Sequence, residues 1–312
     1  MRLFLRSGFG VACVLAAVLA HSSTAQAYCR AGIDTGPDLC IETDAPRLFW
    51  PRSCVSFSFH DLAFERLPAF SEQEVRDVTK ASFDTWAAVD CGRPPFYVEQ
   101  LPGTTSTDPV SFSLDVPNES ILSVLTATEW DGLEGVSKDS VAFAITFLWH
   151  DKNTGEIFDV DMALNLGAGD FGRCDEPCVD GTVDLQNTLT HEAGHVFGLG
   201  HVAIKDATMY PDATPGANFM RDLAPDDEEG YCALDLPSHE CSGGADCVCP
   251  KPPPLRSPRP SHSCSISLPA SQDLPAPALL LFVLALLTRM RARWRAPTNK
   301  RVADSSSATS VL

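Results

Sequence analysis

The sequence favours an α+β fold, and three observations are compatible with that class. Residues 54–59 alternate apolar and polar side chains, as a half-buried strand does. Ser71 can cap a helix, and Glu74 three residues later completes a capping box ahead of an apolar stripe that runs to Val89. Residues 141–149 form a longer apolar run, which indicates a buried strand.

The other expected elements follow in chain order. The patterns at 96–101 and 121–127 are typical of strands, and a turn at 153–155 leads into a further strand at 156–164. A helix is expected from near Thr182 to Phe197, where Gly198 ends it. A last helix is predicted over 225–234, with Pro225 at its first position.

The start of the chain has the features of an export signal. Arg2 and Arg6 precede a short apolar run at 11–20, and small residues at Ala25 and Ala27 form a cleavage site. We therefore predict a signal peptide over 1–27 and a mature chain that begins at Tyr28, located outside the cell or on its surface.

The exported part divides into four regions. A short N-terminal segment, 28–43, precedes one folded domain at 44–236, which holds nearly all the periodic apolar sequence. Residues 237–273 are rich in Pro, Ser and Cys and are expected to form an extended linker. Residues 274–312 are a hydrophobic run followed by a basic end.

The sequence of the C-terminal region indicates either that this tail is processed or that it anchors the protein in a membrane. Its apolar run at 278–287 is shorter than the about 20 residues that span a bilayer comfortably. The order of polar spacer, Cys264, apolar run and Arg cluster resembles the C-terminal sorting signals of exported bacterial proteins, in particular the myxobacterial type. That resemblance implies that Cys264 is the processing or lipid-attachment residue and that tail-processing machinery is a partner; a plain membrane anchor is the alternative.

The chain is strongly acidic. Its 312 residues include 41 Asp and Glu against 23 Lys and Arg, for a formal net charge of −18. A nucleic-acid partner is not expected, because phosphate binding needs a basic face. Solubility accounts for the acidity, and Ca²⁺ binding by some carboxylates is the alternative.

The cysteines predict disulfides. Ten of the 12 remain once Cys13 in the signal and Cys264 in the tail are set aside, and an even set in an exported chain favours disulfides. Local pairing would join Cys29–Cys40, Cys54–Cys91 and Cys174–Cys178, with Cys232 joined to one of Cys241, Cys247 and Cys249. A second, thiolate zinc site is the rival interpretation, but the last three cysteines lack a paired C-x₂-C arrangement.

One motif indicates a metal-binding and catalytic site. Residues 191–201 read H-E-x-x-H-x-x-G-x-x-H. His191 and His195 are four residues apart and share one helical face, so both can bind one zinc ion. Gly198 permits the sharp turn that delivers His201 as a third ligand and leaves the fourth position for water. Glu192 lies close enough to accept the proton of that water, whose pKa zinc lowers to about 7.

These residues are those of the metzincin zinc proteases, and their surroundings are similar to the matrixin branch. Residues 207–211, Ala-Thr-Met-Tyr-Pro, resemble the family's Met-turn, which implies that Met209 forms a hydrophobic floor beneath the zinc ligands. Residues 221–230 resemble the segment leading into the last matrixin helix. The resemblance implies a twisted, mostly parallel sheet with one antiparallel edge strand, two long helices behind it and a zinc cleft in front between subdomains.

The family's calcium-loop residues are not clearly present, but three side chains are candidate Ca²⁺ ligands: Asp159, Asp161 and Asn165. The strand at 157–165 is expected to be an exposed edge that binds an extended peptide by strand addition. No matrixin-like prodomain is evident, and fragments of the family's inhibitory Cys motif occur only around Cys54 and Cys91.

The functional prediction is therefore an exported zinc endopeptidase, a monomer with one catalytic Zn²⁺ and protein or peptide substrates. The alternative is a catalytically inactive surface binding protein with the same fold. Retention of Glu192 beside a complete set of three ligands favours the enzyme, because an inactive site has no chemical need for the base. A third class, a surface protein with a purely structural zinc, would unfold on chelation.

Overall fold

The computed structural model describes residues 28–33, 44–115, 117–137, 140–174, 181–237 and 249, and the backbone pairing of 306–311. The predicted signal peptide, Cys264 and nearly all of the linker and tail lie outside the described residues. Within the described ranges, no helix combines the length and the hydropathy needed to cross a membrane.

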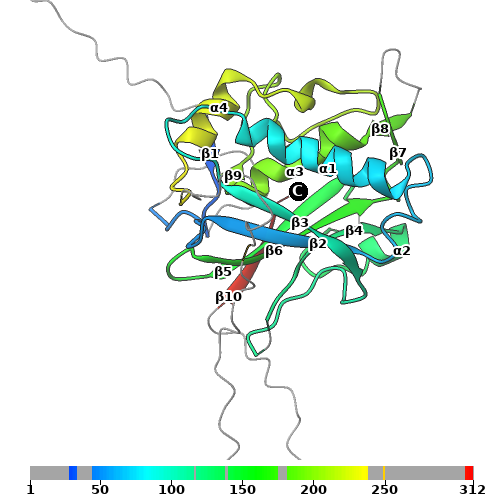
Figure 1. Cartoon of the computed structure of the whole chain (residues 1–312), viewed down its shortest axis with the longest axis horizontal. Coiled ribbons are helices and arrows are strands. Elements are labelled where there is room, and N and C mark those ends of the chain that lie inside the picture. Colours follow the sequence, from blue (N-terminus) through cyan, green and yellow to red (C-terminus); the bar gives the residue numbers. More distant parts are fainter. Residues whose placement is uncertain are drawn as a thin grey trace, which may run out of the picture.

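The main sheet has six strands in the order β10-β5-β6-β4-β2-β3 (Figure 1). Strand β2 is parallel to β3 and β4, β4 is parallel to β6, and β5 is antiparallel to β6. The mixed sheet and its helices give the α+β fold that the sequence favours. Their bounds are β2 Cys54–His60, β3 Tyr97–Thr105, β4 Ser120–Leu125, β5 Ala144–Asp151, β6 Ile157–Asn165 and β10 Ser306–Val311.

The position of β6 corrects one prediction. Residues 157–165 were expected to form an exposed edge, but β6 lies between β4 and β5. The antiparallel strand beyond it is β5, and β10 pairs antiparallel with β5 from Ser306 opposite Asp151 to Val311 opposite Thr146. The order of strands in a sheet depends on long-range pairing, which alternation within one strand does not reveal.

Helices α1 (Glu72–Ala87) and α3 (Leu185–Phe197) lie on the same face of this sheet (Figure 1). The capping box that the sequence predicts at Ser71 and Glu74 is present at the start of α1. A second box, between Thr126 and Glu129, starts the short helix α2 (Ala127–Trp130), which the sequence analysis missed by extending the preceding strand to residue 127.

The start of α3 differs from the prediction by three residues. Residues Thr182–Asp184 form strand β8, which pairs with β7 (Asp170–Gly172), so the helix begins at Leu185. Its N-cap is Asp184, whose carboxylate accepts a hydrogen bond from the Asn187 amide at 2.7 Å. The predicted end at Phe197 is confirmed, and Gly198 follows with φ of 107°.

The C-terminal part of the described domain is short. Helix α4 spans Pro225–Cys232, two residues less than predicted, and has Pro225 in its first turn. A 3₁₀ turn, η1 (Phe219–Arg221), precedes it, and the N-terminal strand β1 (Cys29–Arg30) pairs with β9 (Leu199–Gly200).

Alternation along β6 divides the interior into two parts. Val160, Met162 and Leu164 pack in the main core with the helices. Asp159, Asp161 and Ala163 point to the opposite face, because successive side chains of a strand alternate. A smaller apolar cluster built around Trp130 and Phe147 lies on that second face.

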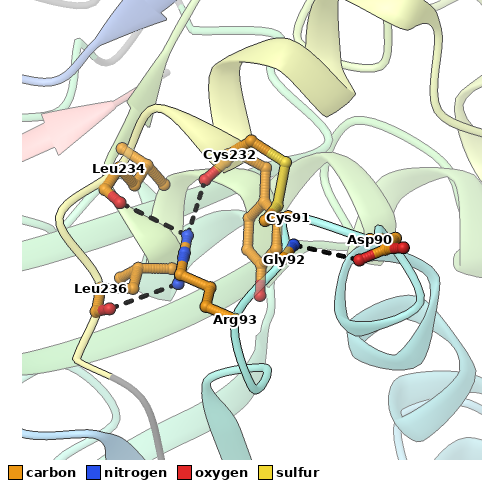
Figure 2. Close-up of a disulfide and its surroundings, with 8 residues drawn as sticks. Asp90, Cys91, Gly92, Arg93, Cys232, Leu234 and Leu236 are labelled. Atoms are coloured by element: carbon orange, nitrogen blue, oxygen red, sulfur yellow. Dashed lines mark hydrogen bonds between the residues drawn. A yellow bond between two sulfur atoms is a disulfide. The ribbon is translucent and has the colours of Figure 1, made fainter.

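The disulfides overturn two predicted pairings. Cys54 is bonded to Cys249, not to Cys91. Cys232 is bonded to Cys91, not to one of Cys241, Cys247 and Cys249 as predicted. The second bridge joins the segment after α1 to the last residue of α4. Beside it, the Arg93 guanidinium donates to the carbonyl oxygens of residues 231, 234 and 236 (Figure 2). The short-range rule failed because the folded chain brings together cysteines that are 195 and 141 residues apart in sequence.

Cys29 and Cys174 are also disulfide-bonded, but their predicted partners, Cys40 and Cys178, lie outside the described residues. Because Cys54 and Cys91 are both in disulfides, neither offers a free thiolate for an inhibitory Cys–zinc contact.

Candidate metal centre

Three imidazoles meet at the C-terminal end of α3. His191 and His195 lie one helical turn apart, and His201 follows β9 after the turn at Gly198. Their Nε2 atoms are 3.1 Å apart for the His191–His195 pair, 3.1 Å for His195–His201 and 3.2 Å for His191–His201. Tetrahedral zinc with Zn–N bonds of about 2.0–2.1 Å spaces its ligand atoms by about 3.3 Å.

The hydrogen bonds of the rings fix which nitrogen is free to bind a metal. His191 Nδ1 lies 2.6 Å from the Thr208 carbonyl oxygen, and His195 Nδ1 lies 2.8 Å from that of Leu199. A carbonyl oxygen only accepts, so each Nδ1 carries the proton and each Nε2 keeps its lone pair.

Electrostatics keep these two rings neutral. Burial, followed by the neighbouring His201, lowers the pKa of His191 to about 3. The same two causes, with His191 added, bring the pKa of His195 well below its usual value. Neutral imidazole is the form that binds metals.

The donor set fits a zinc ion. Lone pairs of His191 and His195 point to a common centre with His201 Nε2, and a cation there would relieve their mutual repulsion. Among the described residues, these three form the one group of His, Cys, Asp or Glu side chains close enough to share a metal. The three histidines singled out by the sequence are thus brought together.

Met209 packs directly against the helix that carries two of the histidines. A Cβ atom placed on Gly194 would lie 2.2 Å from the Met209 sulfur and 2.8 Å from a ring carbon of Trp86. Only glycine therefore allows this close approach between the helix and the turn. Met209 is 1% exposed, as expected for the floor of the site.

Asp227, which the sequence analysis did not identify, holds the same turn in place. Its carboxylate accepts hydrogen bonds from the amides of Thr208 at 2.7 Å and Met209 at 3.0 Å. It also accepts one from the Ala224 amide at 2.9 Å, at the start of α4. Because the Thr208 carbonyl orients His191, Asp227 supports the metal centre from one step away.

Two indoles anchor α3. Trp50 Nε1 donates to the Val196 carbonyl at 2.7 Å, and Trp86 Nε1 donates to the Thr190 carbonyl at 2.8 Å. Both indoles are fully buried. The helix is therefore held to α1 and to the segment before β2 by directional bonds as well as by packing.

The Glu192 carboxylate faces β5. It is 4% exposed, and the Thr146 hydroxyl lies 2.6 Å from Glu192 Oε2. Burial raises the pKa of Glu192 to about 8, and the hydrogen bond from Thr146 opposes that rise. Thr146 was missed by sequence reasoning, because nothing in a strand pattern marks which residue will face a distant helix.

Two of the three candidate calcium ligands, Asp161 and Asn165, are bonded to protein groups. Asp161 accepts bonds from the amides of Ser111 at 3.1 Å and Ile121 at 3.0 Å and from the Trp149 indole at 3.2 Å. The Asn165 side chain bonds to backbone groups of Ala142 and Gly167. Protein donors thus serve Asp161, where a cation was considered.

Comparisons with known proteins agree with this geometry. The family model described as Matrixin matches residues 50–234. Metalloendoproteinase 1-MMP of Arabidopsis thaliana is 25% identical over 190 residues, which are 61% of this chain and 45% of that relative. Metalloendoproteinase 5-MMP of the same plant is 46% identical over 72 residues, 23% of this chain and 19% of the relative. The chain spans less than half the length of these curated relatives.

Proposed function

The chain belongs to the matrixin family, and from that premise we propose that it is a zinc-dependent endopeptidase in which His191, His195 and His201 bind the metal and Glu192 is the catalytic base. The observation that carries the proposal is the convergence of three Nε2 atoms within 3.2 Å of one another. The Glu192 carboxylate on the same helix supplies the proton acceptor that a purely structural metal site does not require.

The mechanism assigns each group a task. A bound zinc ion supplies Lewis acidity, which polarises a peptide carbonyl and makes water more acidic. Glu192 takes the proton from the attacking water and returns it to the leaving amine. Burial raises the pKa of Glu192 to about 8, and a cation held by the three histidines would favour the charged form of this carboxylate. Met209 and Asp227 keep the ligand loop fixed and take no part in proton transfer.

We propose that an extended peptide substrate pairs antiparallel with β5. Thr146 lies in this strand and contacts Glu192, so a peptide along β5 reaches the base. Residues Ser306–Val311 pair with the same strand and support its capacity for strand addition. Substrate and the C-terminal segment would then compete for one edge.

A single proline tests this competition. Ala308→Pro removes a backbone donor in the middle of β10 and should raise the rate of casein cleavage several-fold. Ala303→Pro, outside β10, is the matched control. Equal rates in both variants and the parent would show that β10 does not compete with substrate.

Two segments outside the folded domain bear on where the protein acts. We propose that residues 1–27 direct export and that 274–312 form a sorting tail processed near Cys264 or a membrane anchor. The active form is then an extracellular or surface-attached monomer. Mass spectrometry of the exported protein tests both points, because it reports the first residue and any lipid or cleavage at Cys264.

Casein cleavage by the zinc-loaded full chain tests the catalytic proposal, with Glu192→Ala as its control. Cleavage by the parent and near-total loss in the variant is the expected result. A folded, zinc-loaded parent that leaves casein intact and instead retains peptides would favour a binding protein with this fold.

A further inference from the structure

Among the described residues, Thr146 provides the hydrogen bond to the Glu192 carboxylate. It lies within β5, is 0% exposed and contacts α3 across the main core. Its hydroxyl oxygen is 2.6 Å from Glu192 Oε2 and 3.4 Å from the Glu192 carbonyl oxygen. The hydroxyl has one proton, and the shorter distance assigns its main bond to the carboxylate.

The side chains of Glu192 and Thr146 differ in conformational freedom. Glutamate is long, and ordering such a side chain costs up to about 2 kcal/mol of rotamer entropy. Threonine is branched at Cβ and stiff at χ1, and its backbone is held in the sheet opposite Met162. A rigid donor therefore fixes one oxygen of a flexible carboxylate and leaves the other oxygen free to accept from water.

We infer that Thr146 is a positioning residue that holds the Glu192 carboxylate in its reactive orientation, an inference that rests on the proposed role of Glu192 as the base. The link also joins the strand proposed to hold the substrate to the group that acts on it. A loss of the hydroxyl should therefore slow turnover and leave substrate and metal binding unchanged.

A purely structural role would give a different result. Thr146 shares its face of β5 with Ala144 and Leu148, which are buried and apolar, so a buried hydroxyl there needs some acceptor whatever its function. Replacement by a residue of equal shape would then affect stability and leave turnover intact.

Two variants of the zinc-loaded full chain separate these roles. Thr146→Val keeps the shape and removes the hydroxyl, and Thr146→Ser keeps the hydroxyl and removes a methyl group. With labelled casein at varied concentration, we expect Thr146→Val to lower kcat by about 10- to 100-fold, a part of what general base catalysis contributes. KM and bound zinc should stay within about twofold, and Thr146→Ser should stay within about threefold of the parent.

Thr79→Val is the matched control. Thr79 is equally buried, and its hydroxyl donates to the Val75 carbonyl at 2.8 Å within α1. Its kcat should stay within about twofold of the parent. An unchanged kcat in Thr146→Val, or an equal loss in both Thr146 variants, would overturn the inference.

A structural readout separates this inference from the proposed function. In crystals of zinc-loaded Thr146→Val, the Glu192 carboxylate should leave its parental position, and in Thr146→Ser it should remain there. A carboxylate that stays in place in Thr146→Val overturns the positioning role even if the parent cleaves no substrate. A different outcome would refute only the catalytic proposal: the parent and Glu192→Ala cleave casein at the same rate, and the carboxylate is nevertheless displaced in Thr146→Val.

Discussion

The buried histidines at α3 and the buried aspartates of β6 lie on opposite faces of one sheet. Both groups of polar side chains are removed from water, but their hydrogen-bond partners are arranged differently. At the first site, backbone carbonyls accept from the Nδ1 atoms of His191 and His195, and the Nε2 lone pairs converge. At the second, N–H groups from Ser111, Ile121 and Trp149 surround the Asp161 carboxylate. Acceptors that converge without donors indicate a cation site, whereas acceptors surrounded by donors indicate a structural role.

The contrast shows that burial and ionisable type are not enough to identify a metal site. Asp159, Asp161 and the histidines are all nearly inaccessible to solvent. Burial moves each pKa toward the neutral form, lowering it for His191 and raising it to about 7 for Asp159. What separates the sites is the direction from which hydrogen-bond donors arrive.

The largest expected effect comes from removing one ligand of the metal centre. His195→Ala should reduce bound zinc from about one ion per chain to under about a tenth and abolish casein cleavage. Metal analysis by mass spectrometry measures the first quantity, and circular dichroism checks that the fold persists. Full zinc occupancy in this variant would contradict the assigned ligand set.

Glu192→Gln should give the next largest effect. The amide keeps the shape and cannot accept the proton, so casein cleavage should fall by about 10²- to 10⁴-fold. Bound zinc should remain at the parental level, which distinguishes this variant from His195→Ala. A cleavage rate close to that of the parent would remove Glu192 from its role as the base.

The aspartate site should respond to substitution in stability alone. Both carboxylate oxygens of Asp161 accept from N–H donors. In Asp161→Asn, an NH₂ group replaces one of these oxygens and faces a donor, so at least one hydrogen bond is lost. We expect the free energy of unfolding to fall by about 1–3 kcal/mol. Urea unfolding measures it, and zinc content should be unchanged; a loss of bound calcium from the parent would instead support a cation at this site.

The neighbouring aspartate should give an effect of similar size and opposite sign. Ser120 donates to Asp159 Oδ1 at 2.6 Å, while Oδ2 is buried with no hydrogen-bond partner among the described residues. Asp159→Asn keeps the acceptor and removes the buried charge. At pH 8 it should stabilise the fold by about 1–3 kcal/mol.

The pH dependence of that gain follows from the raised pKa. Burial raises the pKa of Asp159 from 3.8 to about 7, so the folded state binds the proton more tightly than the unfolded state. The stability that this group contributes is complete below pH about 4 and is lost as the pH rises through about 7. The advantage of Asp159→Asn should therefore shrink from pH 8 to pH 5. An advantage that is equal at both values would mean that Asp159 titrates normally.

The sequence by itself determined the local elements. The capping box at Ser71, the end of α3 at Gly198 and the Pro225 helix start depend on residues within a few positions of one another, which a linear pattern contains. The His191–Glu192–His195 arrangement is predictable for the same reason, since a helix fixes which neighbours share a face.

Only the tertiary structure decided how distant segments meet. The Cys91–Cys232 bridge, the interior position of β6, the Thr146–Glu192 contact and the clamp of Asp227 on the Met209 turn each join residues far apart in the chain. Such pairings are selected by the whole packed core, because burial energy is non-directional and does not record which partner will fill a given space. The chain therefore carries the three histidines and Glu192 in a short motif, and the fold supplies the contacts that orient these side chains.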